Sequence, residues 1–240
     1  MNKTYKSILS VVIFSAIFSS SFSQNQTEIE VRDLETWTSA GVTMKLNKDW
    51  KFTLSEQLRL KTNSTIVDNY FTELEAKYSG LKGFELGVGL RYIKNNDNQG
   101  KIQGYESHFR YNLDLGYKHK LGDFKMGYRV RFQNKNELGV SELEGDEAIN
   151  KLRIKLGTEY NIKGWKLDPK ASVEMFNVLG TGFDKLRLTV GTSYGLKKYG
   201  DISLFYRMER ELMPTYVDYP KTTNIIGLNY TYTFKIKTND

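Results

Sequence analysis

Residues 104–133 read GYESHFRYNLDLGYKHKLGDFKMGYRVRFQ, with apolar residues at nearly every second position on either side of a short polar turn. The apolar positions run from Tyr105 to Tyr117 in the first half and from Phe124 to Phe132 in the second. The positions between them are mostly charged or polar. Because successive side chains of a β-strand point to opposite faces, this pattern predicts a long hairpin with one apolar face and one charged face.

The same alternation recurs along the chain, and no helical period follows residue 24. Apolar rows begin at Thr38, Trp50, Tyr70, Phe84, Tyr105, Phe124, Leu152, Trp165, Leu186, Ile202 and Ile226. Bacterial outer-membrane barrels usually have an even number of strands, so we assign residues 26–34 to one further, weakly patterned first strand. The predicted fold class is all-β: a single antiparallel transmembrane β-barrel of about 12 strands.

The connections between the rows alternate in length. Short turns at 47–49, 80–83, 119–123, 163–164 and 197–200 alternate with longer segments at 62–68, 95–103, 136–147, 178–184 and 211–221. Outer-membrane barrels typically have short periplasmic turns and longer outer loops. We therefore expect the short turns to lie on the periplasmic side.

Aromatic residues stand in the apolar rows beside the short turns. They are Trp50, Tyr78, Phe84, Tyr117, Phe124, Tyr160, Trp165 and Tyr194. Aromatic rings favour the membrane–water interface, so this pattern predicts a girdle at one leaflet. A soluble barrel would also alternate, with its apolar row turned inward, but it has no need of a girdle. The rows are also long enough for the roughly 9–11 residues of a tilted membrane strand.

The composition excludes several classes of protein. The chain has 240 residues, no cysteine and a formal net charge of +7. Its Lys and Arg are spread singly along strands, so we expect no nucleic-acid partner. Without cysteine we expect no disulfide, thiolate metal site or lipoprotein anchor. A mean hydropathy of −0.52 argues against a helical membrane protein and is typical of strands with one charged row.

The N-terminus resembles a secretory signal. Basic residues precede a short apolar run at 8–18, and small residues flank a cleavage site at 21–23. We therefore expect a signal peptide at residues 1–23 and an outer-membrane β-barrel at residues 24–240. The expected location is the cell outer membrane. The expected partners are outer-membrane lipid and the barrel-assembly machinery during insertion, and the oligomeric state is left open.

Four strand segments resemble a known family. They are Trp50–Arg59 (WKFTLSEQLR), Gly127–Glu137 (GYRVRFQNKNE), Leu152–Tyr160 (LRIKLGTEY) and Asp168–Phe176 (DPKASVEMF). In these segments the chain is similar to an uncharacterised family of Gram-negative outer-membrane barrels, the domain of unknown function 2490 family. The resemblance implies an outer-membrane barrel over essentially the whole mature chain, and it implies no assigned activity.

Catalysis is limited by the presence of only two histidines. Outer-membrane lipases and deacylases use a serine–histidine pair. Here His108 belongs to a charged row and Ser107 to an apolar row, so the two side chains face opposite sides and form no nucleophile–base pair. His119 falls in a predicted turn. We therefore expect no enzyme and no cofactor; a lipid-modifying enzyme with a serine from another strand stays open as an alternative.

The charged rows predict a barrel lumen with more cations than carboxylates. We assign Arg110, Arg129, Arg131, Arg153 and Lys155 to an anion constriction. We expect the lumen carboxylates Glu73, Glu75, Glu106, Glu159 and Glu174 to act as their ion-pair partners. Rings of charged side chains set selectivity in pores, so we predict a narrow pore or small-solute channel that prefers anions. The alternative is a non-conducting structural or adhesion barrel whose acids and bases fill the lumen.

Two acidic features lie outside this pattern. Glu56 falls in an apolar row, where a β-bulge, a protein contact or an error in the assigned register would explain a carboxylate. A lipid-facing active site would also explain it, but no serine or histidine lies nearby in the same row. The segment 136–147 is acidic, but its spacing matches no calcium loop. We therefore expect a solvated loop there and no metal site.

Overall fold

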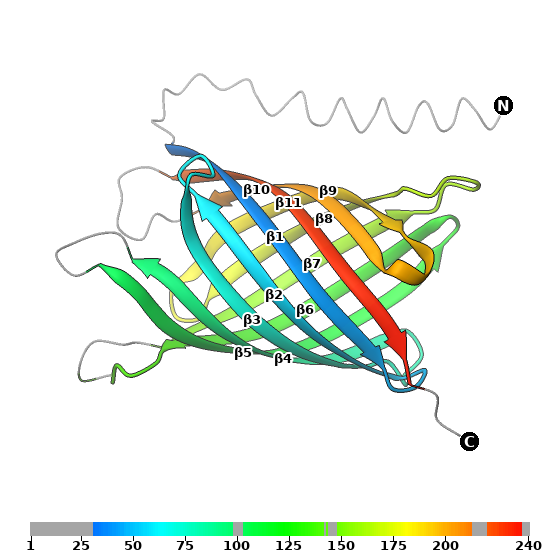
Figure 1. Ribbon diagram of the computed structural model, residues 1–240, viewed down its shortest axis with the longest axis horizontal. Coiled ribbons are helices and arrows are strands. Elements are labelled where there is room, and N and C mark those ends of the chain that lie inside the picture. The colour runs from blue at the N-terminus through cyan, green and yellow to red at the C-terminus, as the bar shows by residue number, and fades with distance from the viewer. Residues whose placement is uncertain (1–30, 98–102, 142, 144–147, 213–219, 237–240) are drawn as a thin grey trace.

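The computed structural model describes residues 31–97, 103–141, 143, 148–212 and 220–236. Within these residues the chain forms a closed β-barrel (Figure 1). The predicted signal peptide and residues 24–30 lie outside the described part of the chain. No helix of the described residues is long and apolar enough to cross a membrane.

Eleven strands form the barrel wall within the described residues. They are β1 (Val31–Lys45), β2 (Trp50–Lys61), β3 (Ile66–Tyr78), β4 (Phe84–Asp97), β5 (Gly104–Leu121), β6 (Phe124–Glu137), β7 (Ile149–Tyr160), β8 (Asp168–Val178), β9 (Gly182–Gly195), β10 (Asp201–Glu211) and β11 (Lys221–Lys235). Each strand pairs antiparallel with the next along the chain, as the alternating rows predict.

The barrel closes through a parallel pair, which corrects the prediction of an all-antiparallel barrel of about 12 strands. β1 pairs with β11 in parallel, from Val31 beside Lys221 to Lys45 beside Lys235. With eleven strands running alternately up and down, the first and last strands run in the same direction, so their seam must be parallel. Of the segment predicted as an extra strand, residues 26–30 lie outside the described part of the chain, and residues 31–34 belong to β1.

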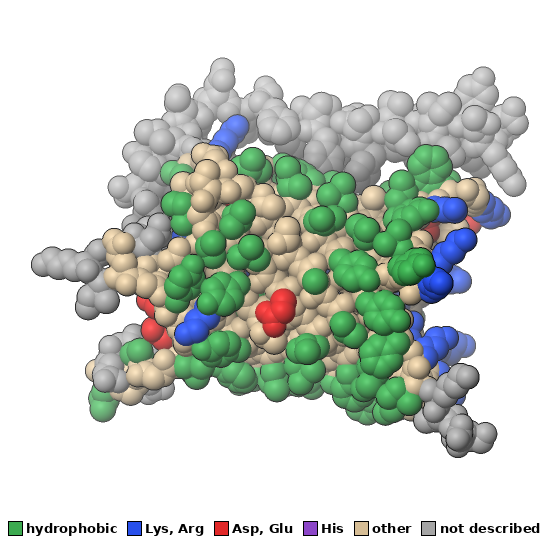
Figure 2. Space-filling model, in the orientation of Figure 1, with side chains coloured by type: hydrophobic (Ala, Val, Ile, Leu, Met, Phe, Trp, Pro, Cys, Tyr) green, Lys and Arg blue, Asp and Glu red, His purple; other side chains and the backbone are tan. Residues whose placement is uncertain are grey.

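The alternation determines which side chains enter the barrel. On β6, Tyr128 and Val130 are 43% and 42% exposed on the outside, whereas Arg131 between its apolar neighbours is only 6% exposed. On the face shown in Figure 2, hydrophobic side chains are spread over the strands between the two ends, with polar side chains and backbone between them. The apolar rows therefore face outward and the charged rows face the lumen.

The two ends of the barrel carry different connections. One end, the tight-turn end, has connections 46–49, 79–83, 122–123, 161–167 and 196–200; the other, the loop end, has 62–65, 98–103, 138–148, 179–181 and 212–220. Lys and Arg side chains gather at the tight-turn end in Figure 2. The predicted alternation of lengths is only partly present, since 161–167 is longer than 179–181.

A hydrogen bond to the Asp168 side chain accounts for the length of connection 161–167. Its Oδ1 accepts a hydrogen bond from the backbone nitrogen of Ile162 at 3.1 Å. The connection therefore closes on Asp168, and β8 begins there rather than at Trp165, where the apolar row was expected to start. Trp165 remains exposed in the connection.

Most of the predicted girdle residues meet as cross-strand pairs at the tight-turn end. The ring centroids are 4.9 Å apart for Trp50 and Tyr78, 4.9 Å for Phe84 and Tyr117, and 4.7 Å for Phe124 and Tyr160. Such tilted aromatic pairs stabilise neighbouring strands. They place a belt of aromatic side chains on the outside of the barrel near one rim.

Candidate functional site

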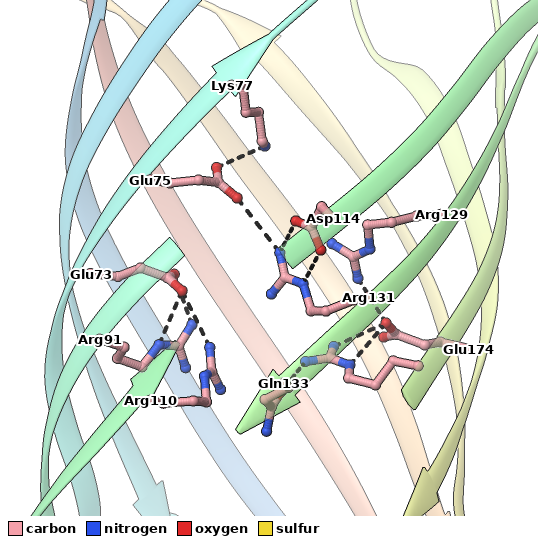
Figure 3. Close-up of polar contacts among 11 residues, drawn as sticks. Glu73, Glu75, Lys77, Arg91, Arg110, Asp114, Arg129, Arg131, Gln133 and Glu174 are labelled. Carbon is pink, nitrogen blue, oxygen red and sulfur yellow. Dashed lines mark hydrogen bonds and ion pairs between the residues drawn. The ribbon is translucent and has the colours of Figure 1, made fainter. Parts of the chain in front are cut away.

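Ion pairs between side chains that face the lumen link neighbouring strands, and one group of them lies on β3, β4 and β5. The Glu73 carboxylate accepts hydrogen bonds from Arg91 at 2.7 Å and from Arg110 at 3.2 Å (Figure 3). The strand register brings these three side chains together, because Glu73 is paired with Arg91 across β3 and β4, and Arg91 is paired with Arg110 across β4 and β5. One carboxylate thus compensates two buried guanidinium groups.

The second group centres on Arg131. Its Nε and Nη2 donate to the two oxygens of Asp114, each at 2.6 Å, which is a bidentate pairing. Glu75 approaches the same guanidinium at 3.6 Å and also pairs with Lys77 at 2.7 Å. In Figure 3 these side chains point toward one another across the lumen. Arg131 is therefore held by two carboxylates.

The third group surrounds Glu174, which is 3% exposed. Its carboxylate is 2.7 Å from Arg129, 3.0 Å from Arg153 and 3.2 Å from Arg187. Arg153 also donates to the Gln133 side-chain oxygen at 3.1 Å. Three guanidinium groups converge on one carboxylate, so this part of the lumen holds more positive than negative charge.

Inward-facing aromatic rings support the arginines. Arg59 lies over the Trp37 ring and Arg91 over the Phe71 ring, each 3.6 Å from the ring centroid. The remaining stacked arginines are Arg153 and Arg187 on Phe176, at 4.4 Å and 4.5 Å, and Arg207 on Phe205, at 4.6 Å. A ring face attracts a cation and also fixes the guanidinium plane. We did not predict from the sequence that aromatic rings would face the lumen. The signal was available, because these aromatic residues stand in the charged rows.

All the predicted lumen residues face the barrel interior, but they play different parts. Arg110, Arg129, Arg131 and Arg153 all have carboxylate partners. Lys155 differs, because no carboxylate lies within 4.0 Å of it among the described residues. The predicted acids all have cationic or histidine neighbours, including Glu159 with Lys125 and Lys170, and Glu106 with His108.

Two cavities adjoin inside the barrel. One, of about 580 Å³, occupies the middle of the lumen among Arg91, Arg131 and Arg153. The other, of about 840 Å³, extends toward the tight-turn end. Lys155 and Arg207 line both cavities, so the two meet at these cations.

Cations dominate the lining of the middle cavity. The basic residues are Arg59, Arg91, Arg110, Arg129, Arg131, Lys135, Lys151, Arg153, Lys155, Lys185, Arg187 and Arg207. The lining carboxylates among the described residues are Glu73 and Glu174. Arg131 and Arg187 also have carboxylate partners, Asp114 and Glu209, which lie outside the cavity lining. The open space itself is nevertheless bordered mostly by positive charge.

Comparison with known proteins gives a family for this barrel. Residues 34–219 match the family model described as "Protein of unknown function (DUF2490)". The chain belongs to the DUF2490 family. No curated protein matches it. Among solved structures it is similar to a porin at 13% sequence identity and a TM-score of 0.36, over 77% of this chain and 58% of the porin chain.

The DUF2490 barrel separates Ser107 from His108, as the alternation predicts. The Ser107 hydroxyl lies 2.7 Å from the Lys94 ammonium, whereas His108 turns inward and lies 3.1 Å from Glu106. His119 falls at the end of β5 rather than in a turn and stacks against Tyr128 at 5.7 Å. The described residues contain no group of His, Asp and Glu that could hold a metal ion.

Glu56 faces outward from this DUF2490 barrel, and neither a bulge nor a register shift accounts for it. Its strand pairs regularly there, with Ala40 on one side and Thr72 on the other. The register irregularity in β2 occurs between Arg59 and Leu60. The Thr72 hydroxyl donates to Glu56 at 2.5 Å, which partly satisfies the carboxylate.

Proposed function

We propose that this DUF2490 chain is an exported outer-membrane β-barrel whose narrow lumen passes small anions in preference to cations. The observation that supports it is the cationic lining of two adjoining lumen cavities, which meet at Lys155 and Arg207. Charged linings attract ions of opposite sign and repel ions of the same sign. A small anion entering the lumen would meet cations along most of its path.

The outward apolar rows support the membrane location in this proposal. Leu113 and Leu115 on β5 are each 50% exposed, and similar side chains cover the wall on other strands. A soluble barrel buries its apolar row inside, whereas here the inside is charged. Placing Arg or Lys on a lipid-facing surface costs about 2–4 kcal/mol at mid-depth, so the charges are stable only in the lumen of such a barrel.

The arginines Arg129, Arg131 and Arg153 supply the selectivity of the proposed constriction. Their carboxylate partners hold the guanidinium groups in place, while the surplus cations around Glu174 keep the local potential positive. Arg suits this role because its planar fork matches the oxygens of carboxylate and phosphate groups.

A second candidate is a non-conducting structural barrel with a filled lumen. The same three arginines favour it, because each is already bound to a carboxylate and Arg131 is bound in bidentate fashion. A barrel whose lumen is closed by such ion pairs would function through its loops and its outer wall.

Conductance separates the two candidates. Purified, refolded protein is inserted into a planar bilayer between unequal KCl solutions, and the reversal potential is measured. The pore proposal expects channel events with a reversal potential of the sign set by chloride. Correctly inserted protein that never conducts supports the filled barrel and contradicts the pore.

A further inference from the structure

The cavity near the tight-turn end is a chamber formed by a row of small residues. Gly127 on β6 stands opposite Gly157 on β7, and Gly157 stands opposite Ser172 on β8. Ser172 in turn stands opposite Thr189 on β9. Because these residues project little into the lumen, the wall leaves about 840 Å³ open there, a volume typical of sites for small organic ligands. We call this space the basic chamber.

Phe205 gives the chamber a further defined wall. Its ring packs against Gly227 of β11, where an added Cβ would collide with the ring. Arg207, two residues further along β10, lies over this ring. The chamber therefore has a fixed aromatic side that holds one guanidinium group in place.

Positive charge predominates in the basic chamber. Its cations are Lys118, Lys120, Lys125, Lys155, Lys170 and Arg207. Glu159 is the single carboxylate of its lining among the described residues. Glu159 is already occupied by Lys125 and Lys170, at 2.5 Å and 3.3 Å.

Lys155 and Arg207 hold the uncompensated charge at the inner end of the chamber. Lys155 stands opposite Glu174 in register, but three arginines already surround that carboxylate. Arg207 donates to the Thr189 hydroxyl at 3.1 Å, and no described carboxylate lies within 4.0 Å of it. Two cations thus face one cavity without a carboxylate partner in the described part of the chain.

We propose that the basic chamber binds the dianionic phosphoryl group of a small solute. Arg207 and Lys155 supply the charge, since Arg offers a planar fork and Lys a compact ammonium for phosphate oxygens. Ser172, Thr189 and Ser203 place hydroxyl donors on the same lining. The inference deepens the proposed function and rests on it, because it names the solute class that the lumen would take up from bulk solution.

The chamber is larger than a bare phosphate ion requires. A phosphoryl dianion held at Lys155 and Arg207 leaves room toward the tight-turn end for the organic part of a phosphate monoester. The exposed cations nearer the rim, Lys118 and Lys125, would attract the solute toward the entrance.

Inorganic phosphate is the probe for a direct test. The refolded barrel in detergent micelles is titrated with phosphate at neutral pH and low salt, and binding is followed by calorimetry. Low salt preserves the attraction between separated charges. We expect saturable binding, weakened about tenfold or more by Lys155→Gln and by Arg207→Gln, because each variant removes a charge-assisted hydrogen bond.

Lys166→Gln is the matched control, since Lys166 is exposed in connection 161–167 and does not line the chamber. Phosphate affinity should be unchanged in it. Retained heat-modifiable migration on a gel shows that each variant is folded. An equal loss in Lys166→Gln, no saturable binding in the wild type, or tighter binding of succinate than of phosphate would overturn the proposal.

The outcome is distinguishable from that of the pore experiment. Saturable, Lys155-dependent phosphate binding by a barrel that never conducts supports the chamber and rejects the pore. Anion-selective conductance without phosphate binding rejects the chamber and leaves the pore in place.

Discussion

At the scale of single residues, the lumen depends on a few shared carboxylates. Glu174 compensates Arg129, Arg153 and Arg187 at once, and Glu73 compensates two further arginines. In a low-dielectric interior, removing a shared counter-charge leaves several cations to repel one another. The stability of the barrel therefore depends strongly on these few shared carboxylates.

Glu174→Gln should destabilise the barrel by about 3–5 kcal/mol, the usual cost of breaking a buried ion pair. The measurement is the free energy of unfolding in urea with detergent micelles. Glu159→Gln is the control: Glu159 pairs with Lys125 and Lys170 at partly exposed sites, so its loss should cost below about 1 kcal/mol. Equal effects of the two variants would contradict the assigned role of Glu174.

Glu56→Leu should have the opposite effect in lipid vesicles. Glu56 faces outward, and among the described residues its one hydrogen-bond partner is the Thr72 hydroxyl. A lipid-facing carboxylate is destabilising, although less so than the about 2–4 kcal/mol of Arg or Lys. Unfolding measured in vesicles should therefore show a more stable variant. Leu54→Glu, on the same face of β2, should be less stable than the wild type. A less stable Glu56→Leu variant would show that the carboxylate has a partner in the membrane.

At the scale of elements, the alternation of side chains predicted most of the fold. Each of the eleven strands corresponds to one predicted apolar row. The two faces of each strand meet different surroundings, so apolar and polar residues alternate with a period of two. The largest difference in extent is at β1, where residues 31–34 (VRDL) precede the predicted row and extend the strand. Their pairing with β11, a contact between the two ends of the chain, holds them there.

The choice of ion-pair partners in the lumen could not be predicted, because it depends on how distant strands pair. The lumen positions of Arg129, Arg131 and Arg153 follow from alternation alone. That Arg131 binds Asp114 while Arg129 binds Glu174 depends on register and side-chain reach, which one sequence does not specify. The inward Trp37 and Phe71 rings likewise needed the assembled barrel to meet Arg59 and Arg91.

The parallel seam can be tested by cross-linking, since the chain has no native cysteine. Thr38 on β1 and Leu228 on β11 are register partners, and adjacent strands lie about 4.8 Å apart, within disulfide reach. Thr38→Cys with Leu228→Cys should form an internal disulfide under mild oxidation, seen as a gel shift reversed by reductant. Met44→Cys with Leu228→Cys, displaced along the seam, should not. A twelfth strand between β1 and β11 would separate Thr38 from Leu228, so absence of the Thr38–Leu228 cross-link would contradict the parallel seam.

At the scale of the whole molecule, the outer wall and the lumen have opposite chemistry. The wall is apolar with aromatic pairs near one rim, and the lumen is charged with more cations than carboxylates along its cavities. If the proposed location is right, the protein should fractionate with the outer membrane. It should also migrate faster on a denaturing gel when unheated than when boiled. Recovery as a soluble periplasmic monomer would contradict the proposed membrane location.

Charge reversal in the lumen tests how selectivity arises. Arg131→Glu should lower the anion preference, but it also places a carboxylate beside Asp114 and Glu75. Lys155→Glu is the cleaner variant, because Lys155 has no carboxylate within 4.0 Å among the described residues and lines both cavities. The loss of anion preference should be largest at low salt, where screening is weakest. Unchanged reversal potentials in both variants would exclude these positions from the conduction path.

The most direct test of the cationic lumen is the reversal potential of the wild-type barrel in a planar bilayer under a KCl gradient. The cation surplus around the two adjoining cavities predicts a potential whose sign reports chloride as the more permeant ion. A potential of the opposite sign would contradict anion preference. Inserted, heat-modifiable protein that carries no current would contradict conduction itself.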